Sequence, residues 1–479
     1  MKVRGFHTVA LLAVALVAAS AQAQTQTWER LIRPGLTYRM EIDLGMPRVI
    51  HALRYTPGAP GLSARPELAQ PTVFNPGEPT NGRATLSQVV QRTQALAGIN
   101  ADFFPWTGDP IGLMVRGGEL VSIPFQARGV FAWGAGYRYF GPATFAGRAT
   151  VNGEDVAING VNQEAGENQV ILNAPIAGVA SAPKGSAVHV ILKTTDRVTP
   201  GGTLTGEVTQ VVAEQVRQPV EAGTVVITAT GTQVPRVASW APGTRVTVRL
   251  QVGNIDWSKA SMAVAGGPVL LPRMNLQAEG IGADFSTTRH PRTAIGRTPA
   301  GDIWLVVVDG RQSMSRGASL PELAEIMSGL GCNEALNLDG GGSTGLNIMG
   351  MGVNRPSGGT ERAIANTLLL FGPMPEPDPN AQFVIRGVPR LTAGQSATYA
   401  VVDQDGQMVP LREVIWAATD AGWIDQAGIL RTLQPGVAKI QALVRGKIVS
   451  VEVTVEAAPG APAAAPAGGG SGTGGRRAG

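Results

Sequence analysis

Three stretches of the 479-residue chain bring carboxylates, arginines and glycines close together in sequence. They are residues 100–104 (Asn-Ala-Asp-Phe-Phe), residues 289–296 with the following Asp309-Gly310-Arg311, and residues 337–344 (Asn-Leu-Asp-Gly-Gly-Gly-Ser-Thr). Arginine offers the paired donors that fit a phosphate group, and glycine lets backbone amides approach an anionic oxygen closely. The residue types therefore favour a site that binds an anion beside carboxylates.

The glycine triplet Gly340–Gly342 is the strongest of these signals, because it follows an apolar, strand-like run and precedes a serine and a threonine. A plainer interpretation stays open for each stretch. Asp-Gly is a common turn dipeptide, and three glycines also suit a wide turn. Taken alone, Asp309-Gly310 fits a turn better than a site, and Arg292 or Arg311 fits a surface charge.

The elements that must position these residues are clearest between residues 303 and 342. The pattern predicts an apolar strand at 303–308, a helix opened by the capping box of Ser319 and Glu322, and a strand at 335–338. This βαβ arrangement makes the two strands parallel, with a right-handed crossover. Ligands gather beyond the carboxyl ends of such strands, so Asp309 and Asp339 should emerge at one edge of the sheet.

Shorter patterns predict further elements around the first polar stretch. Thr85 and Gln88 form a capping box, and the helix that they open should end with Gly98 at its C′ position, before a strand at 99–104. Paired glycines predict hairpins at 114–121 and 264–271.

The chain divides into six predicted segments. An export signal is marked by basic Lys2 and Arg4, an apolar run, and a small-x-small end at Ala21-Gln22-Ala23. The segments are a signal peptide at 1–23, a β lead-in at 24–84, a catalytic domain at 85–372 with a β-rich subregion at about 145–252, a proline-rich linker at 373–381, an immunoglobulin-like domain at 382–456 and a disordered tail at 457–479. We expect a mixed α/β (α+β) catalytic domain and a small all-β sandwich, in a periplasmic or secreted protein.

Composition argues against several classes of function. The net charge is only +4 and the basic residues are dispersed, so the chain has no nucleic-acid footprint. After the apolar run at the start, no segment is long and uninterrupted enough to span a membrane. The single Cys332 forms no intrachain disulfide and should be a packed, inert thiol. The four histidines are scattered, which argues against a zinc site.

Six segments between Ala97 and Phe371, taken together and in order, resemble the phosphodiester glycosidase family. They are Ile99–Phe104, Pro291–Gly296, Leu305–Arg311, Leu320–Ala324, Leu336–Ser343 and Arg362–Asn366. Two positions depart from the family pattern. Thr344 stands where a second serine often follows the glycines, and His290 stands where asparagine often precedes the Pro-Arg-Thr segment.

The resemblance implies hydrolysis of the C1–O bond between a sugar and a phosphodiester, which builds an oxocarbenium-like centre and expels a phosphate monoester. Carboxylates would activate water or stabilise the sugar cation, while arginines and backbone amides would hold the phosphate. The catalytic candidates are Asp102, Asp309 and Asp339. The substrate-binding candidates are Asn100, Arg292, Thr293, Arg311, Asn337, Gly340, Gly341, Gly342, Ser343, Arg362 and Asn366.

The expected partner is a carbohydrate phosphodiester, and a cell-envelope glycan is left open as another. No cofactor and no metal-ligand set is expected, although the aspartates leave a structural Ca²⁺ or Mg²⁺ open. Two other functions fit the same pattern. One is a non-catalytic, glycan-binding protein of the envelope, and the other is an exopolysaccharide hydrolase or transferase whose substrate lacks phosphate.

Overall fold

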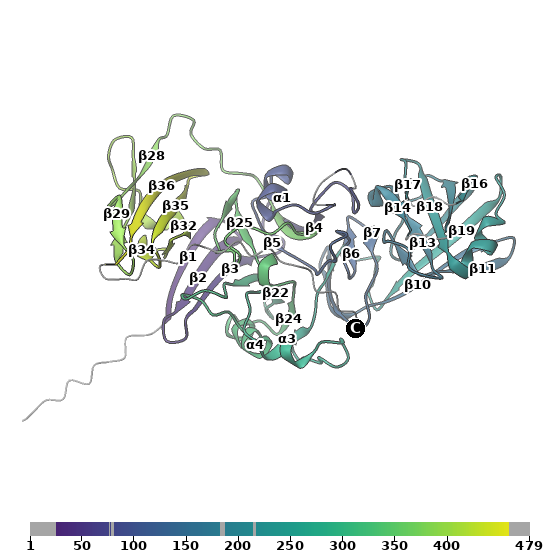
Figure 1. Cartoon of the computed structure of the whole chain (residues 1–479), viewed down its shortest axis with the longest axis horizontal. Coiled ribbons are helices and arrows are strands. Elements are labelled where there is room, and N and C mark those ends of the chain that lie inside the picture. The colour runs from purple at the N-terminus through teal and green to yellow at the C-terminus, as the bar shows by residue number, and fades with distance from the viewer. Residues whose placement is uncertain (1–24, 76, 78–80, 183–186, 214–216, 459–479) are drawn as a thin grey trace, which may run out of the picture.

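The computed structural model describes residues 25–75, 77, 81–182, 187–213 and 217–458 (Figure 1). The predicted signal peptide at 1–23 lies outside these residues, as does the predicted tail apart from residues 457 and 458. Strands greatly outnumber helices, and the helices are short. The mixed α/β expectation is therefore correct only in part, because the described chain is mainly β-structure. No helix among the described residues is long and apolar enough to cross a membrane.

A seven-stranded sheet lies near the centre of the molecule (Figure 1). Its strands, in spatial order, are β1 (Thr25–Arg33), β2 (Leu36–Asp43), β3 (Arg48–Tyr55), β23 (Ile303–Val308), β22 (Arg292–Arg297), β24 (Glu334–Asn337) and β21 (Val269–Leu271). Helices α3 (Ala283–Thr287) and α4 (Leu320–Gly329) pack on one face. Alternate residues of β23 enter the cores on the two faces, and each fully buried aliphatic side chain contributes roughly 1.5–3 kcal/mol. This explains the continuous apolar run at 303–308.

The predicted βαβ unit is present with one change. β23 and β24 run in the same direction, but β22 lies between them and pairs antiparallel with both. The connecting helix α4 begins with the predicted capping box, in which Ser319 accepts from the Glu322 amide. Because β23 and β24 are parallel, the residues that follow them, Asp309 and Asp339, leave the sheet at the same edge.

A five-stranded sheet contributes to the core on the other face of the central sheet. It consists of β26 (Met351–Gly352), β25 (Leu346–Ile348), β5 (Ala97–Asn100), β27 (Asn366–Phe371) and β4 (Ser63–Leu68). Helix α1 (Leu86–Thr93), which precedes β5, begins with the predicted Thr85 capping box. Gly98 was wrongly assigned to the end of this helix, since Gln94 takes the left-handed conformation instead. Gly98 lies within β5, where a Cβ atom would collide with Leu369.

One of the two predicted hairpins forms. Strands β6 (Met114–Arg116) and β7 (Glu119–Ser122) pair antiparallel, and they belong to a sheet with β20 (Met262–Ala265), β8 (Gly129–Gly134) and β9 (Tyr137–Pro142). The hairpin predicted at 264–271 is wrong, because β20 and β21 lie in different sheets. The Gly266 and Gly267 amides instead donate to Gly129 and Asn337, so the chain crosses between sheets here.

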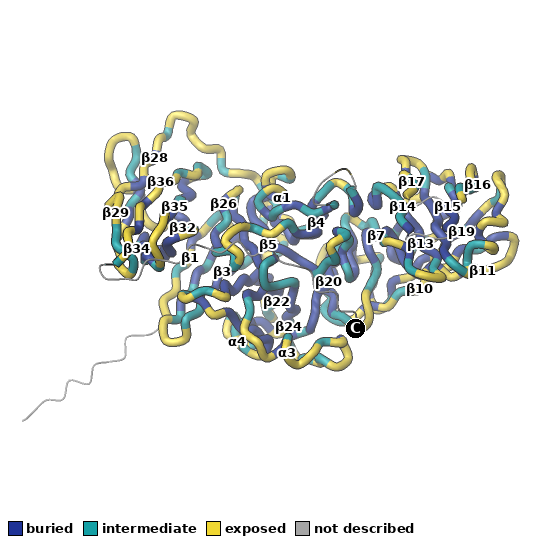
Figure 2. Tube along the Cα trace, in the orientation of Figure 1, coloured by how far each residue is buried: buried dark blue, intermediate teal, exposed yellow. Residues whose placement is uncertain are grey.

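The stretch from 144 to 253 builds a separate β-rich body at one end of the molecule (Figure 1). Its eight-stranded sheet has the order β11 (Glu154–Ile158), β10 (Thr144–Val151), β19 (Arg245–Gly253), β16 (Thr203–Ala213), β15 (Ala187–Lys193), β18 (Thr224–Thr230), β13 (Val170–Asn173) and β12 (Gly160–Val161). The strands β14 (Val179–Ser181) and β17 (Arg217–Pro219) form a small pair, and α2 (Val234–Ala238) packs against β15. Figure 2 shows buried positions along the interior of this body.

Residues 383–456 form short strands at the opposite end of the molecule (Figure 1). A four-stranded sheet consists of β29 (Arg390–Thr392), β36 (Lys447–Glu456), β35 (Gly436–Val444) and β32 (Val414–Asp420). A three-stranded sheet consists of β30 (Ser396–Thr398), β34 (Ile429–Thr432) and β33 (Gly422–Ile424). The strands β28 (Phe383–Arg386) and β31 (Ala400–Asp403) form a separate pair. Trp416 and Tyr399 help to fill their own core. The immunoglobulin-like character of these strands stays a prediction.

Candidate active site

The three polar stretches meet beyond the ends of β5, β22 and β24. The Asp339 amide donates to the Ala101 carbonyl at 2.9 Å, and the Gly341 amide donates to the Pro291 carbonyl at 2.8 Å. The Asn100 side chain donates to the Asp339 carbonyl at 2.6 Å. Loops from distant parts of the sequence are thus joined directly, and they form the candidate site.

Asp102 is the more deeply buried carboxylate of this site, with 3% of its surface exposed. Its two oxygens accept from the Phe103 amide at 2.8 Å and the Gly112 amide at 2.7 Å. Burial raises the pKa of Asp102 to about 6, against the opposing effects of Arg128 and the two amides. Asn366 accepts from the Asp102 amide at 2.6 Å, so this predicted residue fixes the aspartate's backbone.

Asp339 is the second carboxylate, and it remains partly exposed. One oxygen accepts from the Gly340 amide at 2.8 Å. Burial raises the pKa of Asp339 to about 6; the Ser343 hydroxyl and Gly340 amide beside it act against that rise, and the charge of Asp102 adds to it. Two carboxyl groups that interact and titrate near neutral pH can divide between one acid and one base.

Two exposed arginines flank the glycine triplet. A Cβ atom on Gly341 would lie 3.2 Å from Nη2 of Arg311, and one on Gly342 would collide with the Arg362 guanidinium. Among the described residues, no hydrogen bond or ion pair partner is present for Arg362, although its charge helps to lower the pKa of Asp339. Side chains at the two glycines would displace the arginines, which explains why the turn contains glycine.

His290 supports one of these arginines. Its Nδ1 accepts from Nη2 of Arg311 at 3.3 Å. Partial burial and the charges of Arg292 and Arg311 lower the pKa of His290, so the ring is neutral at pH 7 and can accept this bond. The position at which the sequence departs from the family pattern therefore retains a polar role.

The backbone of the glycine triplet offers fewer free donors than the sequence suggests. The Gly340 amide is bonded to the Asp339 carboxylate and the Gly341 amide to Pro291. In the part of the chain that the structure describes, no acceptor is bonded to the Gly342 amide, and the buried Ser343 hydroxyl lacks a well-formed hydrogen bond. The Ser343 hydroxyl lies beside the Asp339 carboxylate, so the Gly342 amide is the donor left for an anion.

Three predicted binding residues hold the loops together. Oδ1 of Asn100 accepts from the Thr293 hydroxyl at 2.8 Å and from the Gly345 amide at 3.0 Å. Asn337 donates to the Gly267 carbonyl at 2.7 Å, and it is fully buried, as is Thr293. Their hydrogen bonds go to protein groups, so their contribution to the site is its shape.

Arg292 does not occupy the phosphate-binding position expected for it. Only 1% of its surface is exposed, and its guanidinium donates to the carbonyls of Ala318, Phe285 and Thr288 at 2.9, 2.7 and 3.0 Å. Side chains alternate along a strand, so Arg292 shares the helix-covered face of β22 with Ala294. The arginine fastens the segment around α3 to the sheet.

Asp309 lies behind the glycine segment in a buried network. Its carboxylate accepts from the Arg355 amide at 3.1 Å and from the Asn354 side chain at 3.3 Å. Nε2 of His51 lies 3.4 Å away, and Nδ1 of the same ring lies 2.8 Å from the Tyr38 hydroxyl. With 2% of its surface exposed, Asp309 is placed to support the site loops rather than to meet a substrate.

Sequence reasoning missed Arg128, which acts on Asp102, and Glu279, which interacts with Arg128. The Arg128 guanidinium lies 4.5 Å from the ring centre of Phe103, and its charge lowers the pKa values of Asp102 and Glu279. Burial raises the pKa of Glu279, whose carboxylate accepts from the Val269 amide at 2.9 Å. Neither Arg128 nor Glu279 belongs to a local motif, so no sequence signal singles them out.

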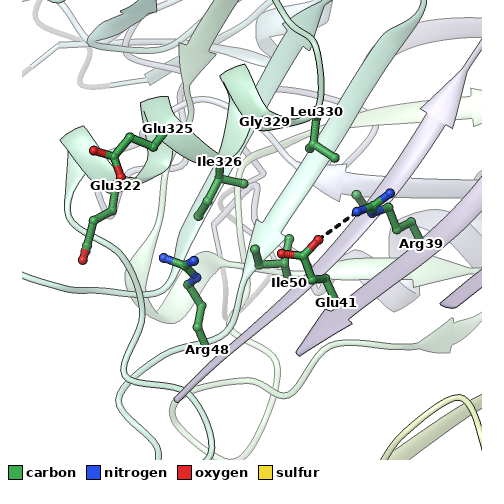
Figure 3. Close-up of a pocket in the computed structure, with 10 residues that line it drawn as sticks. Arg39, Glu41, Arg48, Ile50, Glu322, Glu325, Ile326, Gly329 and Leu330 are labelled. Carbon is green, nitrogen blue, oxygen red and sulfur yellow. Dashed lines mark hydrogen bonds and ion pairs between the residues drawn. The ribbon is translucent and has the colours of Figure 1, made fainter. Parts of the chain in front are cut away.

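The described residues contain no group of three or more His, Cys, Asp or Glu side chains arranged to hold a metal ion. Cys332 is buried, and burial raises the pKa of its thiol to about 12, which agrees with the expected inert thiol. A cavity of about 270 Å³ between β2, β3 and α4 is lined by Arg48, Glu322 and Glu325 among others (Figure 3). None of the predicted site residues lines it.

Comparison with known proteins finds a family likeness for part of the chain. Residues 198–371 match the model of the phosphodiester glycosidase family. This segment therefore resembles a phosphodiester glycosidase domain in sequence. It contains Arg311, Asp339, the glycine triplet and Arg362, whereas Asp102 comes from outside the matched segment.

The individual relatives are informative about the fold rather than about an activity. An uncharacterised, prophage-derived protein of Bacillus subtilis is 36% identical over 95 residues, which are 20% of this chain and 14% of that protein. The chain thus spans about one seventh of this curated relative. A hypothetical protein from Synechocystis superposes with a TM-score of 0.61 and 25% identity over 73% of this chain and 64% of its own. A protein from Burkholderia pseudomallei gives a TM-score of 0.57 and 23% identity over 68% and 74%.

Proposed function

We propose that the protein hydrolyses the C1–O bond of a sugar-1-phosphodiester and releases free sugar and a phosphate monoester. The family match over residues 198–371 supports a glycosidase. One observation carries the finer assignment: Asp102 and Asp339, whose pKa values are raised to about 6, adjoin a glycine turn flanked by Arg311 and Arg362. The carboxyl groups that would act at the sugar C1 atom thus lie next to the cationic groups that would bind the phosphate.

The arrangement suits each stage of this reaction. The phosphate monoester that leaves has a second pKa of roughly 6, so positive charge around it replaces much of the protonation that an alcohol would need. Arg311, Arg362 and the Gly342 amide supply these donors. Water adds its hydroxyl to C1, and its proton passes to a carboxylate and then to solvent or the phosphate.

The two carboxylates are suited to different tasks. Asp339 is partly exposed and has one oxygen without a backbone donor among the described residues, so it is the better group to exchange a proton with substrate or water. Asp102 has both oxygens bound to amides, which suits it to stabilising positive charge on the sugar. A site that only binds glycan has no need of two interacting carboxyls with raised pKa values, which favours catalysis over binding alone.

The proposal also includes the location of the protein and the segments beside the catalytic region. Export to the periplasm or the medium is proposed from the residue pattern at 1–23. The boundaries of the catalytic region at 85–372, the linker at 373–381 and the immunoglobulin-like strands at 382–456 are likewise proposed from the sequence.

The test is a substrate panel with both products measured. Purified protein is incubated with UDP-N-acetylglucosamine, with other sugar-1-phosphodiesters, and with the same sugars joined to p-nitrophenol. We expect free sugar and a phosphate monoester from at least one phosphodiester, with inhibition by inorganic phosphate. Hydrolysis of the nitrophenyl sugars alone, insensitive to phosphate, would point to the hydrolase whose substrate lacks phosphate. Binding without turnover across the panel would point to the glycan-binding protein.

A further inference from the structure

The C-terminal strands share a core with the central sheet. Side chains alternate along β32, where Val414 and Trp416 enter the strands' own core. Ile415 and Ala417 face the other way, into the cluster that also holds Tyr38 and Met40 of β2. One face of β32 thus packs on the C-terminal strands and the other on the central core. A freely moving, appended domain would not need this second contact.

Two arginines of the main body bind backbone carbonyls of these C-terminal strands. Arg30, with 8% of its surface exposed, donates to the carbonyls of Val414 at 3.0 Å and Gln426 at 2.5 Å. The Arg355 guanidinium donates to the carbonyls of Gly422, at 3.3 Å, and Asp420. Charge-assisted hydrogen bonds of this kind fix position and direction together.

Arg355 also joins the candidate site through its backbone. Its amide donates to the Asp309 carboxylate, and its carbonyl accepts from Gln312 at 2.9 Å. These two contacts bracket the turn that presents Arg311. The preceding residue, Asn354, donates to the carbonyl of Thr344 at 3.3 Å and so reaches the segment after the glycine triplet.

We infer that Arg355 is a positioning residue, through which the C-terminal strands hold Arg311 and the glycine turn in the geometry that receives a phosphate. The role of Arg311 in this statement rests on the proposed function. Residues 383–456 then belong to the working enzyme, and their task is neither tethering nor separate glycan capture. A shift of one site loop by about 1 Å can lower a rate by roughly a hundredfold, so such a clamp matters to catalysis.

The experiment uses the full chain with three variants. Arg355→Ala removes both guanidinium bonds but keeps the backbone amide on Asp309. Arg355→Lys retains a cationic donor that can reach a carbonyl. Arg412→Ala is the matched control, because Arg412 lies on the same C-terminal body with 81% of its side chain exposed. Circular dichroism and thermal melting establish that each variant is folded.

Two measurements are made on the folded variants. Amide hydrogen exchange is followed by mass spectrometry in peptides that cover 309–316 and 340–346. Steady-state kinetics on the phosphodiester that wild type hydrolyses separates KM from kcat. In Arg355→Ala we expect faster exchange in both peptides and a KM raised about tenfold, with partial recovery in Arg355→Lys and wild-type behaviour in Arg412→Ala.

The outcomes separate this inference from the proposed function. Unchanged exchange in Arg355→Ala would overturn the inference, and so would faster exchange with unchanged kinetics. If wild type hydrolyses no phosphodiester, the proposed function fails, and the exchange measurement alone decides whether Arg355 couples the C-terminal strands to the site loops.

Discussion

At the scale of single residues, the site concentrates groups whose burial opposes their charge. Asp102 is buried and Asp339 is half-buried, and desolvation is the main cause of their raised pKa values. Arg128 offsets part of this effect at Asp102, and Arg362 does so at Asp339. Carboxyl groups whose pKa is raised by burial are common at catalytic centres, because they can exchange a proton near neutral pH.

The raised pKa of Asp339 predicts how the free energy of unfolding depends on pH. The pKa of Asp339 is about 6 in the folded chain and roughly 3.9 when unfolded. The folded state binds the proton more tightly, so the stability that Asp339 contributes is fully present below about pH 4 and is lost as the pH rises through about 6. Asp339→Asn removes this loss. The difference in unfolding free energy, variant minus wild type, should rise by on the order of 1–2 kcal/mol between pH 4 and pH 8.

Urea unfolding at several pH values measures this difference. The substitution Asp256→Asn provides a matched control, because the Asp256 side chain is 39% exposed and its carboxylate, among the described residues, pairs with its neighbours Lys259 and Ser258. A difference for Asp339→Asn that stays constant from pH 4 to pH 8 would contradict the raised pKa.

At the scale of elements, the glycine turn after β24 determines how closely Arg311 and Arg362 approach the backbone of that turn. Gly342 has no Cβ, and the Arg362 guanidinium occupies the place where one would be. We predict that Gly342→Ala displaces Arg362, leaves the fold intact, and weakens phosphate inhibition by roughly tenfold, which corresponds to one charge-assisted hydrogen bond. Gly329→Ala, in the last turn of α4 where a Cβ meets nothing, is the control. Inhibition constants for inorganic phosphate check the prediction, which fails if the two variants behave alike.

The sequence predicted those elements whose determinants are local. The capping boxes of Thr85 and Ser319 and the apolar strand at 303–308 are read within a few residues, and all three are present. The hairpin at 264–271 failed because its glycines serve a crossing between sheets, and that depends on Gly129 and Asn337 far along the chain. Local patterns carry no information about such partners.

The same division applies to the site. The three polar stretches that the sequence singled out lie together, since direct hydrogen bonds join them, while their role in a site stays a prediction. The orientation of Arg292 could not be read, because it depends on which face of β22 the helices cover. Arg128 and Glu279 were missed because only the folded chain brings Arg128 near Asp102 and Glu279 near Arg128.

At the scale of the whole molecule, two β-rich bodies, residues 144–253 and residues 383–456, lie at opposite ends of the part that contains the central sheet (Figure 1). The core of the body at 144–253 continues into β6, β7, β8 and β20, whereas the C-terminal strands have a core of their own and place Ile415 and Ala417 in the central core beside β2. The candidate site lies where the ends of β5, β22 and β24 meet. Its aspartates and arginines come from segments more than 200 residues apart, as the bond between Asn100 and Asp339 shows. Catalysis therefore depends on the assembled molecule.

The central claim is that Asp339 takes part in cleaving the sugar–phosphate bond. The most direct test measures sugar release from the phosphodiester that wild type hydrolyses fastest, using wild type, Asp339→Asn and the control Asp256→Asn. Proton transfer by a positioned carboxyl contributes roughly a hundredfold to ten-thousandfold, so the rate of folded Asp339→Asn should fall by that factor while the control keeps the wild-type rate. A folded Asp339→Asn variant that retains the wild-type rate would contradict the account.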